Sequence, residues 1–138
     1  MIAVDTNVLL RYLIDPIDNS NPSWQGKAAR KVINSEEFVF ISDIVIAETE
    51  WVLESVFEFT KQEISALIDA IASNSKFQYE DWSALQCALL DYKECSRVEL
   101  SDYLIARRAN HKGATSLYTF EGQKKLGRLG IVTTLKNK

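Results

Sequence analysis

The chain has 138 residues, 46% of them hydrophobic and 25% charged, with a formal net charge of −3 at pH 7. This composition excludes a disordered chain, and the length predicts a single soluble domain over residues 1–138. No apolar run reaches the roughly 20 residues of a membrane-spanning helix, and Asp5 and Arg11 interrupt the N-terminus where a signal peptide is apolar, so we expect a cytoplasmic protein without membrane contact.

Short apolar runs alternate with longer segments of helical periodicity. In chain order we predict strand 2–4, helix 6–13, a loop at 15–21 with Pro16 inside it and Pro22 directly after it, helix 23–35, strand 38–41, helix 43–57, helix 61–73, strand 77–79, helix 82–95, helix 102–111, strand 115–119, helix 122–127 and strand 131–134. The alternation predicts an α/β fold, with a central, mostly parallel sheet of about five short strands flanked by helices.

Polar residues mark the starts of several predicted helices. Ser23 and Asp81 are predicted N-caps, and Thr60 with the glutamate three residues later has the spacing of a capping box. Ser101 is predicted to start the helix at 102–111, and Gly113 to end it.

Four acidic residues fall where a strand passes into a helix or where a helix faces inward. Asp5 follows the first predicted strand, Glu121 follows the fourth, and Glu48 and Asp102 lie on helices. Ligands in open α/β sheets bind beyond the carboxyl ends of the strands, where these side chains would gather. Neighbouring carboxylates repel each other, and a divalent cation such as Mg²⁺ or Mn²⁺ removes that conflict. The pattern predicts a metal-dependent enzyme that acts on phosphodiesters.

Each of these acids also has a purely structural interpretation. Asp5 is a good N-cap, and Asp102 in a first turn suits the helix dipole. Glu48 is bracketed by apolar residues, whereas Glu50 and the acids four and eight residues after it are predicted to share a solvated side. The joint placement of the four acids favours one common site.

Positive charge is concentrated toward the C-terminus. Residues 36–106 hold fifteen acids and four bases, whereas residues 107–138 hold eight bases and a single acid, Glu121. A basic segment next to a metal site could bind phosphates, and a basic helix with a solvated tail is the alternative.

Four segments together resemble the motifs of PIN-domain proteins, especially the VapC toxins of toxin–antitoxin pairs. Residues 5–13 (DTNVLLRYL) are similar to the first motif and residues 42–53 (SDIVIAETEWVL) to the second. Residues 102–106 (DYLIA) resemble the third, and residues 117–121 (LYTFE) the fourth, which usually ends in Asp rather than Glu. The resemblance covers essentially the whole chain.

The resemblance implies a three-layer PIN fold, a magnesium-dependent endoribonuclease site, a homodimer, and a small cognate antitoxin protein that threads into the site. It implies that Asp5 and Asp102 are direct metal ligands, and that Glu48 holds a metal-bound water or a second metal. Asn7 and Thr119 would be supporting polar groups. At Glu121, one methylene longer than Asp, metal contact could be direct, water-mediated or absent.

The resulting hypothesis is hydrolysis of an RNA phosphodiester by a metal-activated water at a four-carboxylate site. The predicted phosphate contacts are Arg107, Arg108, Lys112, Lys124 and Lys125.

Three alternatives remain open. One is a PIN nuclease for RNA processing without an antitoxin, and another is a catalytically inactive PIN domain that binds RNA or protein. A phosphotransfer receiver or a dehalogenase-type phosphatase is less favoured, since such phosphatases need a second Asp where Asn7 stands.

Overall fold

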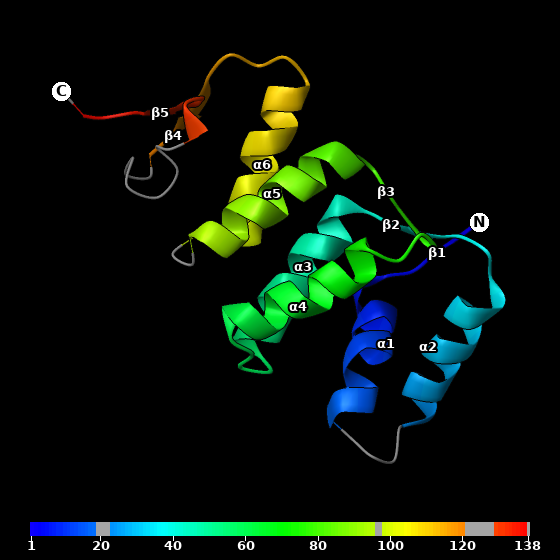
Figure 1. Cartoon of the computed structure of the whole chain (residues 1–138). Helices are drawn as coiled ribbons and strands as arrows, with labels where there is room; N and C mark the ends of the chain where they lie inside the picture. The colour runs from blue at the N-terminus through cyan, green and yellow to red at the C-terminus, as the bar shows by residue number, and fades with distance from the viewer. Residues whose placement is uncertain (19–22, 96–97, 121–128, 138) are drawn as a thin grey trace. The chain divides into compact units, whose positions relative to one another are not determined.

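The computed structural model describes residues 1–18, 23–95, 98–120 and 129–137 (Figure 1). They form two compact units, Met1–Glu80 and Asp81–Lys138. No helix in the described ranges is long and apolar enough to cross a membrane.

The first unit is built on a parallel three-stranded sheet. Its strands are β1 (Ile2–Ala3), β2 (Val39–Ile41) and β3 (Phe77–Tyr79), in the order β1-β2-β3. Ile2 is opposite Val39, and Val39 is opposite Phe77. Because parallel strands need a crossover, two helices stand between each strand and the next. They are α1 (Thr6–Asp18) and α2 (Trp24–Ser35), then α3 (Asp43–Ser55) and α4 (Lys61–Ala72).

The core of the first unit is aliphatic. Both strand residues that flank Phe40 are fully buried, and each helix contributes residues spaced three or four apart. The fully buried helical side chains include Leu9, Ile33, Leu53 and Ile64. This spacing is the signal from which the helices were predicted.

A close contact joins α1 to α2, which lie side by side in Figure 1. The Ser23 hydroxyl caps α2 by accepting from the Gly26 amide at 3.1 Å, and it donates to Asp15 Oδ2 at 2.8 Å. Arg11 donates to the other Asp15 oxygen at 3.3 Å. The Ser23 hydrogen bond, with a smaller contribution from Arg11, lowers the pKa of the buried Asp15 carboxyl. Gly26 leaves the space that this carboxylate occupies.

Gly26→Ala is expected to destabilise the protein, although Gly→Ala inside a helix ordinarily stabilises it by about 1 kcal/mol. A Cβ at position 26 would lie 1.8 Å from Asp15 Oδ2. The carboxylate would have to leave its partners, which should cost about 1–3 kcal/mol in urea unfolding. In an Asp15→Ala background the same substitution should cost less. Stabilisation by Gly26→Ala alone would contradict this packing.

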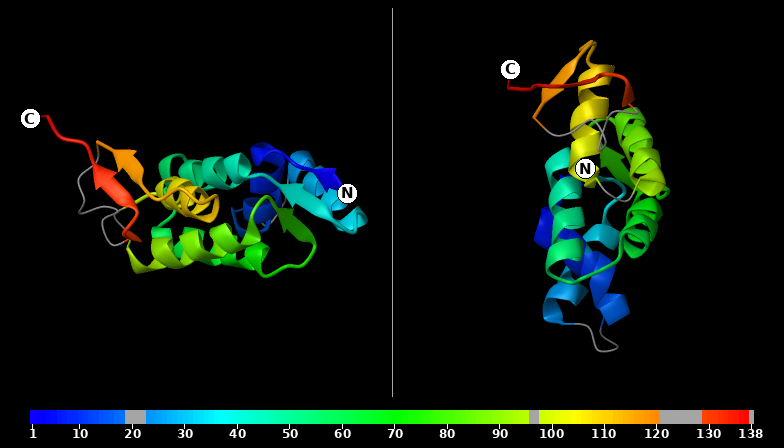
Figure 2. Two further views of the ribbon diagram at one scale, coloured as in Figure 1. Left: turned by 90° about the horizontal axis from the view of Figure 1, so that it is seen from above. Right: turned by 90° about the vertical axis from the view of Figure 1, so that its left-hand side faces the viewer.

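The second unit pairs two helices with a parallel two-stranded sheet. Helix α5 (Trp82–Glu94) packs along α6 (Leu100–His111), and the buried side chains between them include Tyr92 and Tyr103. Strand β4 (Leu117–Thr119) runs beside β5 (Val132–Thr134), as Figure 2 shows. Gly113 follows the end of α6 with a φ of 95°, a left-handed conformation that glycine adopts without strain.

The predicted α/β fold with a parallel sheet is confirmed, with all five predicted strands present and every described strand pair parallel. The strands are divided between a three-stranded and a two-stranded sheet. The loop predicted from Asp15 is wrong at its start, because α1 continues through Pro16 to Asp18. The start predicted at Ser101 is also wrong, since α6 begins at Leu100 with Glu99 as its N-cap. The helix predicted at 122–127 lies outside the described residues.

Candidate active site

The carboxyl edge of the three-stranded sheet gathers acidic side chains. Strand β1 leads through Asp5 into α1, and β2 leads through Ser42 into α3. Glu80 follows β3, and its Oε1 accepts a hydrogen bond of 2.9 Å from the Asp43 amide at the start of α3. Because the strands are parallel, all three ends lie on the side of the sheet where such folds bind ligands. Sequence reasoning missed Glu80, which is marked only by its position after a strand.

Asp5 caps α1, as its position after the first strand predicts. Its Oδ1 accepts from the Val8 amide at 3.0 Å, and its carbonyl accepts from the Leu9 amide at 3.1 Å. Within the described residues, Oδ2 has no hydrogen-bond donor, and the side chain is exposed. The cap therefore fixes the direction of the carboxylate and leaves one oxygen open to a ligand. Asn7, two residues later, is also exposed.

Glu48 is tied to the start of α1. Its Oε1 accepts a hydrogen bond of 3.0 Å from the hydroxyl of Thr6, the residue after Asp5. Helices α1 and α3 are in contact, so the bond joins two segments that lie 42 residues apart in sequence. Thr6 is a positioning residue that sequence reasoning missed, because a threonine in a first helical turn is unremarkable without knowledge of the facing helix.

The prediction that Glu50 faces solvent is wrong. Glu50 is 1% exposed and shares the buried side of α3 with Ile46 and Leu53, whereas Glu48 is exposed. Ile46 precedes Glu50 by four positions and Leu53 follows it by three, which places all three on one face of the helix. The same geometry turns Glu48 away from the core, so the apolar neighbours assumed for it, Ile44 and Trp51, are themselves 70% and 55% exposed.

The remaining predicted site residues belong to the second unit. Asp102 lies half-buried in the first turn of α6, where its negative charge interacts favourably with the helix dipole. Thr119 ends β4, and its carbonyl accepts from the Leu135 amide at 2.7 Å. Glu121, Lys124 and Lys125 lie outside the described residues.

Two of the predicted RNA contacts interact with acids. Arg107 binds Asp91 through two hydrogen bonds, Nε to Oδ2 at 2.6 Å and Nη2 to Oδ1 at 2.8 Å. This pairing raises the pKa of Arg107. Arg108 lies 3.9 Å from Asp81, close to Lys112 at the end of α6. Arg107 thus has a structural partner in the helix it packs against.

The first-unit carboxylates fit a divalent metal ion in their chemistry. Asp5 and Glu48 offer hard oxygen ligands at an exposed site, which suits Mg²⁺ or Mn²⁺. In the part of the chain that the structure describes, no lysine or arginine forms an ion pair with either carboxylate. That part also contains no cluster of three or more acidic, histidine or cysteine side chains with metal-binding geometry.

Two comparisons, with curated proteins and with solved structures, gave one neighbour of low sequence identity. No curated protein matches the sequence. Among solved structures, the chain is similar to a crystal structure of VapC20 from Mycobacterium tuberculosis, a toxin that cleaves the sarcin–ricin loop. The two share 17% sequence identity with a TM-score of 0.43, and the match covers 96% of this chain and 97% of that chain.

The PIN domain family matches residues 2–128, a range that includes Asp5, Glu48, Asp102 and Glu121. Proteins of this family are typically nucleases and generally use divalent metal ions. Because the match spans nearly the whole sequence, this protein belongs to the PIN domain family.

Proposed function

We propose that this protein is a metal-dependent endoribonuclease and the toxin of a toxin–antitoxin pair. Membership of the PIN domain family supports a nuclease. One geometric observation supports the proposal further: Thr6, the residue after Asp5, donates a hydrogen bond to Glu48, near the sheet edge where α/β proteins bind ligands. The proposal includes cytoplasmic location, a homodimer and a cognate antitoxin protein.

In the proposed reaction, the residues of this chain orient the phosphate and the attacking water. Asp5 would hold the metal through its carboxylate, whose direction is already fixed because Oδ1 accepts a hydrogen bond from the Val8 amide. Glu48, oriented by Thr6, accepts a hydrogen bond from the attacking water. From the family resemblance, Asp102 is proposed as a further metal ligand, and Asn7 and Thr119 as supporting polar groups. Bound Mg²⁺ or Mn²⁺ would neutralise charge on the phosphate and lower the pKa of the water.

The RNA strand is then positioned by cations. Lys112 and Arg108 at the end of α6, together with Lys124 and Lys125, are the proposed phosphate contacts. Arg107 is left out of this set because its guanidinium is bound by Asp91.

Removal of divalent metal is expected to abolish cleavage, and its return is expected to restore it. The purified, partner-free protein would be incubated with total cellular RNA in chelator, in Mg²⁺ and in Mn²⁺, and the products separated on a denaturing gel. Discrete fragments in the metal lanes alone are the expected result. Cleavage that persists in chelator would contradict the metal site.

A catalytically inactive binding module is the second candidate, favoured by one observation. Glu121 stands where the family's fourth motif usually has Asp. Folded protein that binds RNA or protein yet cleaves nothing with either metal would select this alternative.

A further inference from the structure

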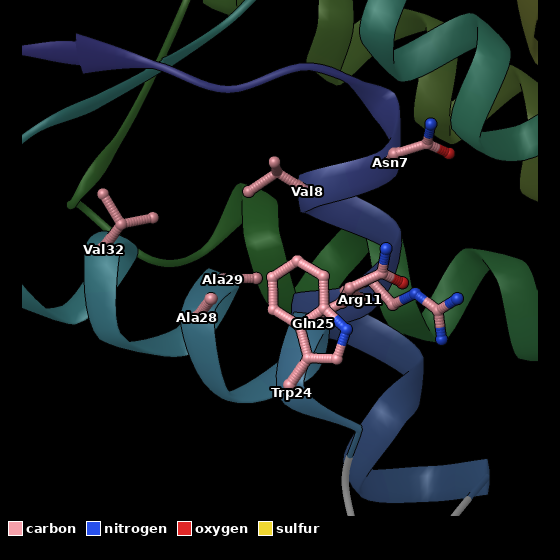
Figure 3. Close-up of a pocket in the computed structure, with 8 residues that line it drawn as sticks. All are labelled: Asn7, Val8, Arg11, Trp24, Gln25, Ala28, Ala29 and Val32. Atoms are coloured by element: carbon pink, nitrogen blue, oxygen red, sulfur yellow. The ribbon is translucent and has the colours of Figure 1, made fainter.

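A pocket of about 560 Å³ lies between α1 and α2 in the first unit. Both helices contribute to its walls, as the labelled side chains in Figure 3 show. The residues that matter for its chemistry are Asn7, Val8 and Arg11 from α1, and Trp24, Gln25 and Val32 from α2.

The apolar part of the pocket includes an exposed aromatic ring. Trp24 is 76% exposed and Val32, more than two turns further along α2, is 41% exposed, so two apolar side chains that line the pocket are open to a ligand. An indole offers a flat apolar face together with one N–H donor, which suits a planar aromatic ligand. A nucleobase is such a ligand, and unpaired RNA bases commonly stack on aromatic side chains.

The polar part of the pocket supplies hydrogen bonds of the kind that a base edge accepts and donates. Asn7 and Gln25 each carry an amide with both donor and acceptor groups. The Arg11 guanidinium has five N–H donors, and its hydrogen bond to Asp15 uses one nitrogen. This mixture favours a base over a purely aliphatic ligand.

The charge of α2 favours a polyanion over an apolar protein segment. In a chain with a net charge of −3, residues 24–35 hold Lys27, Arg30 and Lys31 and no acid. Lys31 follows Trp24 by seven positions, so the two project from neighbouring parts of the helix surface. A strand whose base stacks on Trp24 would pass its phosphates along these cations. The three basic residues of α2 can be read from the sequence, but the phosphate contacts were predicted from the larger excess of basic residues near the C-terminus.

Two residues that line the pocket, Asn7 and Val8, follow the candidate metal ligand Asp5 closely in sequence. The Val8 amide donates to Asp5 Oδ1, and the Val8 side chain lines the pocket. Asn7, which lies between Asp5 and Val8, also lines it. A base in this pocket therefore belongs to the same stretch of strand as a phosphate at Asp5.

We propose that the pocket between α1 and α2 is a base-binding subsite, in which one unpaired base of the RNA stacks on Trp24 next to the phosphate that is cleaved. This inference rests on the proposed function and names a specificity-determining element of the same site. Base preference would then be set by the amides of Asn7 and Gln25.

Binding of a short, labelled single-stranded oligoribonucleotide tests the subsite. The protein would carry Asp5→Asn, so that the strand stays intact in Mg²⁺, and affinity would be followed by fluorescence anisotropy. Adding Trp24→Ala is expected to weaken binding by about 5- to 150-fold, the range that one stacked base contributes. Trp24→Phe keeps a ring and should recover much of that loss.

Two controls separate stacking from general effects. Trp51→Ala removes another exposed tryptophan that does not line the pocket, and it should leave the affinity unchanged. An oligonucleotide of equal length with abasic sites should bind with the same affinity whether or not the protein carries Trp24→Ala, and more weakly than the base-containing strand binds the protein that keeps Trp24.

Three results would overturn the subsite. Equal binding of the base-containing strand with and without Trp24→Ala, while the wild-type protein still cleaves RNA, would reject the subsite and keep the proposed function. Failure of the wild-type protein to bind or cleave any RNA would reject both. A change of oligomeric state on Trp24→Ala, seen by sedimentation with RNA affinity unaltered, would make the pocket a protein interface instead.

Discussion

Asp5→Asn is expected to lower the rate of RNA cleavage by at least about 100-fold, a factor that even outer groups around a metal site can contribute. The substitution removes a negative charge from the proposed ligand while keeping the side-chain shape. It also keeps the helix cap, because an asparagine oxygen can accept from the Val8 amide as Asp5 Oδ1 does at 3.0 Å. Stability in urea should therefore change little, and the measurement is single-turnover cleavage in saturating Mg²⁺.

Asp5→Ala is the informative companion to Asp5→Asn. It removes the ligand and the cap together, so it should lose both cleavage and about 1 kcal/mol of stability. Together, the two variants separate the metal-ligand role of the Asp5 carboxylate from its helix-capping role. Near-normal cleavage by Asp5→Asn would reject Asp5 as a metal ligand, whatever happens to the alanine variant.

Local signals in the sequence identified most of the helix starts. The Ser23 cap, the reciprocal capping box of Thr60 and Glu63, and the Asp81 cap are all present as predicted. Strand 77–79 was also placed correctly at both ends. Each of these features depends on residues within about four positions of one another, so a single sequence contains the whole interaction.

The errors arose where distant residues decide the outcome. The helical period of α3 correctly placed Glu48 and Glu50 on opposite sides, but it could not show which side faces the core. Pro16 disfavours a helix interior, yet α1 extends past it. One turn of that extension carries Asp15, which packs against Gly26 and Ser23 of α2. Neither the burial of the Glu50 side of α3 nor the contact of Asp15 with α2 can be inferred from a short window of local sequence.

The same distinction, between local signals and contacts of residues far apart in sequence, applies to the candidate site. Asp5 was predicted from its position after a strand and Glu48 from its motif, but the hydrogen bond from the Thr6 hydroxyl to Glu48 needed the structure. Basic residues were predicted as phosphate contacts from their charge alone. Charge in a sequence does not show whether a basic side chain already has a buried acidic partner. Arg107 illustrates the consequence, because the acid it binds lies 16 residues earlier on α5.

Arg107→Ala is expected to destabilise the protein by about 3 kcal/mol or more, measured by urea unfolding. The side chain of Asp91 is 5% exposed, and Arg107 supplies its charged partner through two short hydrogen bonds. Removing Arg107 would leave a buried carboxylate without that compensation. Replacing both residues together, as Arg107→Met with Asp91→Leu, should cost much less, since no buried charge remains.

Lys112→Ala provides the matched comparison that separates stability from RNA contact. Lys112 is exposed at the end of α6, so its removal should change stability by less than about 0.5 kcal/mol. If Lys112 binds a phosphate, the slope of log affinity against log salt concentration should fall by about 1. Arg107→Ala, assayed under conditions where it is folded, should leave that slope unchanged. A reduced slope with unaltered stability in Arg107→Ala would restore Arg107 as an RNA contact and reject the structural role assigned to its pairing with Asp91.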